Sequence, residues 1–150
     1  MIFLFSASQN PEDFNLPLDY TFAENSWGNL FYKIYNTKLN YGDAKTQCES
    51  DGAFLAIPRS EIENDFFAGH FSTEWNGGFW IGINDIEQEG HFVAVDGREI
   101  SWTNWGKNEP NGGANENAVE ICPCRGNDWN DLDASNSKKF VCSLNIEGNI

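Results

Sequence analysis

Oxygen-bearing side chains gather in two short segments of the carboxyl-terminal half of the chain, about twenty residues apart. Carboxylate and amide oxygens are the ligands that Ca²⁺ prefers, commonly six to eight to an ion. The two segments together supply five such side chains, so water or a bound ligand would complete the shell. The residues are Glu109 and Asn111 on either side of Pro110, then Glu116, then Asn130 and Asp131 directly after Trp129.

The local backbone favours convergence of these side chains. Pro110 restricts the chain, and a cis Glu109–Pro110 bond would let both neighbours of the proline point at one ion. Asn130 and Asp131 are adjacent, and both can face one ion where a strand ends or turns. The residues therefore predict a calcium site.

A catalytic reading of the same residues is weaker. Glu109 and Glu116 resemble the paired carboxylates of a glycosidase. However, a coordinated carboxylate is held ionised by its metal and cannot easily act as an acid. His70 and His91 stand in no arrangement of nucleophile and base. We therefore expect no enzymatic activity.

The composition indicates one folded domain with an acidic surface. The chain has 150 residues, of which 40% are hydrophobic and 15% aromatic, enough apolar material for a core. Its formal charge of −14 repels nucleic acid, heparin and anionic membranes. No apolar stretch approaches the roughly 20 residues that span a bilayer.

Four cysteines match no zinc-finger spacing and form no Cys-x-x-Cys pair. Disulfides in an oxidising compartment are the better interpretation, which predicts a secreted, extracellular protein. Residues 1–9 resemble the end of a signal peptide but lack a basic region, so they are read as a truncated leader or an ordinary tail.

Local patterns predict strands at both ends and two helices between them. Residues 30–35 form an aromatic, β-branched run typical of a strand. Tyr41, Ala44 and Cys48 have helical spacing, and a capping box predicts a second helix from Ser60. Further strands are expected at 79–83 and 139–142, separated by a long polar loop region. The order predicts an α+β domain whose ends meet in one sheet. We expect a tail or a loosely packed extension at 1–24, the domain at 25–145 and a tail at 146–150.

Taken together, these motifs resemble C-type lectin-like domains, over about Trp27 to Cys142. The resemblance is carried by Glu-Pro-Asn at 109–111, Trp-Asn-Asp at 129–131, Trp-Ile-Gly-Ile at 80–83 and the span between Cys48 and Cys142. It implies the C-type lectin fold, with two helices flanking antiparallel sheets and a long calcium-binding loop region.

The resemblance also implies a function, calcium-dependent carbohydrate binding. Two vicinal hydroxyls of a sugar would complete the calcium shell while the ligands hydrogen-bond to those hydroxyls. Glu-Pro-Asn goes with mannose, fucose and N-acetylglucosamine in the family, so the expected partners are glycans with terminal mannose-type sugars. One such sugar binds at about millimolar strength, which makes a homo-oligomer useful. The implied calcium and sugar ligands are Glu109, Asn111, Glu116, Asn130 and Asp131.

Two departures from the family pattern concern a second calcium ion and the cysteines. The candidate second site comprises Asp85, Glu89, Glu116 and Asn117, and it is weakened because Gly112 and Asn117 replace acidic residues. The family implies a Cys48–Cys142 bridge, worth roughly 4–5 kcal/mol in the chain-entropy model. Alanines at 118 and 134 replace the family's inner disulfide. Cys122 and Cys124 can close a local bridge, pair between subunits or stay reduced; we rank the local bridge slightly higher.

The main alternative is a non-sugar ligand on the same fold, namely a protein, ice or a mineral surface. A second alternative is binding to microbial surfaces by aggregation. Calcium dependence and competition by mannose separate these readings. Trp75, Trp80, Trp102 and Trp105 are expected in the core, and Lys107 on the surface.

Overall fold

The computed structural model describes residues 10–26 and 28–146. Within these residues the chain forms eight strands, two α-helices and three short 3₁₀ helices. In chain order these are η1 (Pro11–Phe14), β1 (Thr21–Asn25), β2 (Gly28–Leu39), α1 (Tyr41–Ser50), β3 (Phe54–Leu55), α2 (Glu61–Ala68), β4 (Phe79–Asn84), β5 (Val93–Ala94), η2 (Gly113–Asn115), β6 (Ala118–Cys122), η3 (Pro123–Arg125), β7 (Asp128–Leu132) and β8 (Lys138–Ile146).

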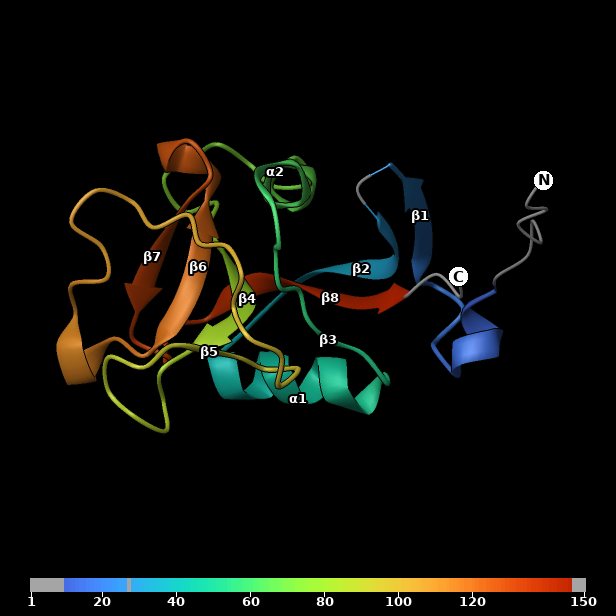
Figure 1. Cartoon of the computed structure of the whole chain (residues 1–150), viewed down its shortest axis with the longest axis horizontal. Coiled ribbons are helices and arrows are strands. Elements are labelled where there is room, and N and C mark those ends of the chain that lie inside the picture. The colour runs from blue at the N-terminus through green and yellow to red at the C-terminus, as the bar shows by residue number, and fades with distance from the viewer. Residues whose placement is uncertain (1–9, 27, 147–150) are drawn as a thin grey trace.

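The strands follow the order β1-β2-β8-β4-β6-β7, with β3 added to β8 and β5 to β4. Strands β2 and β8, from opposite ends of the domain, pair antiparallel from Asn29↔Ile146 onwards. The prediction that the ends meet in one sheet is confirmed. In Figure 1, β1 lies at one end of the molecule and β6 and β7 lie at the other.

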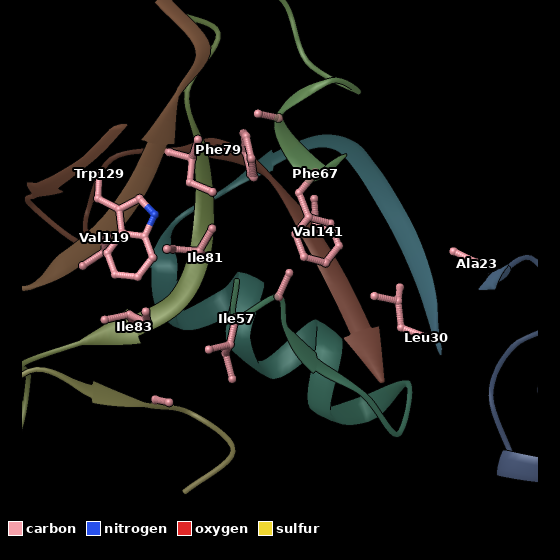
Figure 2. Close-up of a cluster of buried hydrophobic side chains, with 14 residues drawn as sticks. Ala23, Leu30, Ile57, Phe67, Phe79, Ile81, Ile83, Val119, Trp129 and Val141 are labelled. Atoms are coloured by element: carbon pink, nitrogen blue, oxygen red, sulfur yellow. The ribbon is translucent and has the colours of Figure 1, made fainter. Parts of the chain in front are cut away.

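The helices cover opposite sides of the sheet, as the alternation of side chains along β4 requires. Phe79, Ile81 and Ile83 belong to a buried cluster that includes Phe67 of α2. Trp80, between them in sequence, belongs to a second cluster with the buried face of α1. Figure 1 shows α1 and α2 on either side of β8, and Figure 2 shows side chains of the first cluster.

Both helices begin where the sequence predicts. Asn40 caps α1 by accepting from the backbone N–H of Asp43, and Ser60 caps α2 by accepting from that of Glu63. Such caps satisfy amide groups that have no partner inside the helix. The inward face of α1 is Tyr41, Ala44 and Cys48, as the spacing predicted. Cys48 forms a disulfide with Cys142, which ties α1 to β8.

One ladder differs from the antiparallel arrangement that we expected. Strand β4 pairs with β8 in parallel, at Phe79↔Lys139 and Trp80↔Phe140. The connection between β4 and β8 runs through β6 and β7, so the two central strands are not joined by a hairpin and antiparallel pairing is not imposed.

The described part of the expected amino-terminal tail is packed against the domain. Strand β1 pairs antiparallel with β2, and Leu16 and Tyr20 are each only 5% exposed. The Tyr20 hydroxyl donates to Asp51 Oδ2 at 2.7 Å, which ties this segment to the end of α1. Residues 10–24 therefore extend the folded unit.

Some sequence predictions fall outside the described residues. These are the leader reading of residues 1–9, the starting point of the resemblance at Trp27, and all but the first residue of the tail at 146–150; Ile146 itself ends β8. Within the ranges that the structure describes, no helix has the length and apolarity needed to cross a bilayer.

Candidate functional site

The predicted ligands lie on the long loop between β5 and β6 and on strand β7. Glu109, Asn111 and Glu116 belong to the loop, and Asp131 belongs to β7, which pairs with β6. The Glu109–Pro110 bond is cis, as hypothesised. Pairing of β7 with β6 brings the strand end beside the loop, although twenty residues separate the two segments in sequence.

Asp131 holds the loop at its Glu-Pro-Asn segment. Its side chain is buried, with 1% of the residue exposed, and its two carboxylate oxygens accept from the backbone N–H groups of Asn111 and Gly112, each at 3.0 Å. The Asn111 Nδ2 group in turn donates to Glu109 Oε1 at 3.2 Å. Glu109, Asn111 and Asp131 thus form one connected cluster.

Negative charge accumulates in this cluster. Burial and, after it, the neighbouring Asp131 carboxylate together raise the pKa of Glu109 to about 7, against the opposing charge of Arg125. Burial also raises the pKa of Glu116, with added contributions from Asp131 and Asp133. Carboxylates that oppose one another's ionisation are stabilised by a cation placed among them.

Asn130 takes a different direction from the other four. Its Nδ2 group donates to Glu120 Oε1 at 3.4 Å, and Glu120 lies opposite it in the β6–β7 register. Asp131, the next residue, reaches the loop instead, because successive side chains of a strand point to opposite faces. The structure therefore connects Glu109, Asn111, Glu116 and Asp131 through contacts and charge, and it places Asn130 beside Glu120.

The residues of the candidate second site also lie close together. The Asp85 backbone N–H donates to the Asn117 carbonyl at 3.1 Å, and Asp85 Oδ2 accepts from the Gly90 N–H at 2.8 Å. Partial desolvation, followed by the charges of Asp85 and Asp131, raises the pKa of Glu89. Asp131 thus lies within electrostatic reach of both candidate sites.

The donor set fits a hard cation. Three buried side-chain oxygens without a hydrogen-bond partner belong to the predicted ligands: Asp85 Oδ1, Glu109 Oε2 and Asn117 Oδ1. Such oxygens are costly to bury unless something binds them. Within the described part of the chain, no group of three or more His, Cys, Asp or Glu residues is arranged to hold a metal ion. The described acceptors are therefore a mixture of carboxylates and the amide groups of Asn111 and Asn117, and they are not a compact group of charged ligands.

Sequence reasoning missed Arg125, which lies beside this cluster. Its Nη1 is 4.0 Å from Glu109 Oε1, and its Nε is 3.4 Å from Asp128 Oδ1. Arg125 ends the short helix η3, directly after Cys124, which is bonded to Cys122. The local disulfide that we ranked first is thus the pairing found. The Cys-Pro-Cys segment was the sequence signal for an unusual local turn, and Arg125 directly follows that segment.

The tryptophan predictions hold except at one position. Trp80 is fully buried, and Trp102 and Trp105 pack edge-on against Trp129, each with ring centroids 5.7 Å apart. Trp75 is 79% exposed, so its placement in the core was wrong. It lies in the turns between α2 and β4, where no regular element covers it. Lys107 is exposed, as expected.

The arrangement of two helices around this sheet, with a long acceptor-rich loop at one end, is that of a C-type lectin-like domain. A family profile described as "Lectin C-type domain" matches residues 37–144. The chain belongs to this family.

Two curated relatives illustrate the extent of the similarity. Lectin BRA-3 of Megabalanus rosa is 35% identical over 133 residues, covering 81% of this chain and 80% of the relative. Human C-type lectin domain family 3 member A is 36% identical over 109 residues, covering 71% of this chain and 55% of the relative. The chain spans about half the length of several curated relatives that it matches.

Solved structures share the fold. The C-type lectin CEL-I from Cucumaria echinata superposes with a TM-score of 0.76 at 26% identity, covering 87% of this chain and 98% of that one. A protein described as a calcium-independent type II antifreeze protein gives the same TM-score at 20% identity, covering 87% and 95%. The second likeness concerns the fold alone.

Proposed function

We propose that this chain binds carbohydrate in a calcium-dependent manner, through Glu109, Asn111, Glu116, Asn130 and Asp131. The observation that carries the proposal is the convergence on Asp131. This buried carboxylate bonds the backbone of the Glu-Pro-Asn segment, while Glu109 beside it keeps a buried oxygen without a partner. Membership of the C-type lectin domain family supports the same reading.

The protein's side chains supply binding and orientation. The carboxylates of Glu109 and Glu116 accept hydrogen bonds from sugar hydroxyls, and the amide groups of Asn111 and Asn130 donate to them. A bound calcium ion would supply positive charge for two vicinal hydroxyl oxygens. Because one small sugar buries little surface, each site binds at about millimolar strength. Several sites on one glycan-bearing surface then give useful avidity.

The order Glu-Pro-Asn favours mannose, fucose and N-acetylglucosamine over galactose. The proposed partners are glycoconjugates that end in such sugars, and the proposed location is extracellular, where disulfides persist. The acidic chain, with a formal charge of −14, disfavours nucleic acid and anionic membrane as partners.

Binding to immobilised mannose and immobilised galactose, with calcium and with chelator, tests this function. Retention on mannose only with calcium, released by free mannose, is the expected result. Asn111→Asp should abolish retention, because it replaces an amide donor with a carboxylate. Asn115→Asp adds the same charge at an exposed position of η2 and should leave retention unchanged. Retention that ignores chelator would overturn the proposal.

The alternative is a non-sugar ligand, namely a protein, ice or a mineral surface. It is supported by the likeness of fold to a protein described as a calcium-independent type II antifreeze protein. A chain that binds calcium but no sugar, and that inhibits the growth of ice or mineral crystals, would favour it.

A second calcium ion is proposed at Asp85, Glu89, Glu116 and Asn117. It is supported by the unpartnered buried oxygens of Asp85 and Asn117. Calorimetric titration should give two ions per chain, the second bound more weakly because two carboxylates of the family pattern are replaced here. Asp85→Asn should remove the weaker ion and leave the tighter one; a single ion in the unaltered chain would contradict this second site.

A further inference from the structure

Strand β6 buries a carboxylate that is not one of the proposed ligands. Val119 and Ile121 face the cluster covered by α2, so Glu120 between them points to the other side of the sheet. The residue is only 6% exposed. A buried ionised carboxylate needs partners, because its desolvation is otherwise costly.

Glu120 has two partners, one on each neighbouring segment. Its Oε2 lies 2.7 Å from Lys138 Nζ, at the start of β8, and its Oε1 accepts from Asn130 Nδ2 on β7. The Lys138 side chain is only 18% exposed. Gly78 leaves room for the carboxylate, since a Cβ added there would overlap Glu120 Oε2. Space, charge and register are thus all adapted to this carboxylate.

The bond to Glu120 determines which way the Asn130 amide faces. An ionised carboxylate only accepts hydrogen bonds, so the amide must turn its Nδ2 group toward Glu120. The Asn130 Oδ1 atom is then directed away from Glu120. An amide free to rotate would present nitrogen and oxygen in turn, and only the oxygen can bind a cation.

We propose that Glu120, anchored by Lys138, is a positioning residue that fixes the Asn130 amide with its oxygen available to calcium. This inference rests on the proposed function, because Asn130 must be a calcium ligand for its orientation to matter. Residues that orient metal ligands commonly change metal affinity about 10–100-fold when they are replaced.

Glu120→Gln tests the proposal, because glutamine keeps the shape but can offer either an oxygen or an amide group to Asn130. Calcium affinity measured by calorimetry should fall about tenfold. Glu63→Gln is the matched control. Glu63 is likewise a buried glutamate with a basic partner, Arg59, at 3.8 Å, but it belongs to α2, which covers the other side of the sheet. This control should leave calcium affinity within about twofold of the unaltered chain.

A double-mutant cycle distinguishes positioning from a general loss of structure. If Glu120 acts through Asn130, Glu120→Gln should have no further effect on calcium affinity in an Asn130→Ala background. An equal loss in both backgrounds would overturn the proposal, as would unchanged affinity in Glu120→Gln. If Glu120→Gln does not fold, Lys138→Met tests the same anchor, with the same expected loss and the same criterion.

Failure of the proposed function and failure of the positioning role would give different results. If the unaltered chain binds no calcium, the proposed function is wrong and the role of Glu120 falls with it. If the unaltered chain binds calcium and the Glu120 variant binds it equally well, only the positioning role is wrong.

Discussion

The core around the two helices and the loop region that carries the candidate site are stabilised by different interactions. Around α1, α2 and the central strands, large apolar side chains fill two continuous clusters, and the Cys48–Cys142 bridge joins helix to strand. At the candidate site, the Glu-Pro-Asn segment is joined to β7 by hydrogen bonds from backbone amides to the Asp131 carboxylate, and buried oxygens of Glu109 and Asn117 have no hydrogen-bond partner. Hydrophobic burial is stable without a ligand. A cluster of carboxylates is not, so we expect calcium to affect the loop region far more than the core.

The largest expected effect comes from breaking the core bridge. Replacing both Cys48 and Cys142 by alanine should lower the free energy of unfolding by roughly 4–5 kcal/mol, measured by urea denaturation in chelator. Calcium affinity of the folded fraction should stay within about twofold. A parallel loss of calcium affinity would mean that the two ends are not independent.

Asp131→Asn probes the other end. Loss of this charge should weaken calcium binding by at least about 100-fold, or about 2.7 kcal/mol, measured by calorimetry. Unfolding in chelator should change much less, because asparagine still accepts one hydrogen bond. Asp133→Asn, an exposed neighbour, is the control. A variant that unfolds in chelator but keeps its calcium affinity would mean that Asp131 stabilises the fold and is not needed for calcium binding.

Features of the core that depend on local sequence could be predicted, whereas contacts between distant segments could not. The spacing of Tyr41, Ala44 and Cys48 predicted the buried face of α1, because helical periodicity is a local property. The proposed ligand set came from the oxygen-bearing residue types of two segments and from the family resemblance, since neither segment specifies its partner alone. Glu120 and Arg125 were missed because their partners come from other segments. The exposure of Trp75 contradicted a prediction based on residue type alone.

Residues 10–24 were interpreted as a tail or a loosely packed extension because they show no sustained period. Their attachment depends on contacts distant in sequence, such as Tyr20 with Asp51, and no local pattern reports these. The segment therefore belongs with the core end of the molecule.

Tyr20→Phe tests that assignment. The hydroxyl donates to a carboxylate that also accepts from the Tyr35 hydroxyl at 2.5 Å, and a bond to a charged group contributes about 1.5 kcal/mol or more. The free energy of unfolding should fall by about that amount, with calcium affinity unchanged. Tyr32→Phe, outside this cluster, serves as control. An unchanged unfolding curve would mean that the segment is not part of the cooperative unit.

The pH dependence of calcium binding is the smallest expected effect. Because the pKa of Glu109 is raised to about 7, protons compete with calcium below that pH. Affinity should fall about tenfold between pH 7.5 and 6.0, measured by calorimetry, since each bound ion displaces one proton.

Without calcium, the stability of the fold should change with pH in the opposite direction to calcium affinity. A raised pKa means that the folded chain binds a proton that the unfolded chain releases, so stability in chelator should rise as pH falls from above 7 toward 5. Glu109→Gln should weaken both trends, and the remainder should come from Glu116, whose pKa is also raised. Identical pH profiles for the variant and the unaltered chain would assign the titration to another group.

The two amide bonds that Asp131 accepts also bear on how quickly an ion could leave. Both bonds attach the loop, which itself carries Glu109, Asn111 and Glu116, to Asp131 of β7, so opening of the loop would separate the proposed ligands and let a bound ion leave. The residence time of a calcium-bound sugar would then follow loop opening rather than the strength of any single coordination bond. Loop substitutions distant from every ligand would change the dissociation rate while leaving specificity among sugars intact.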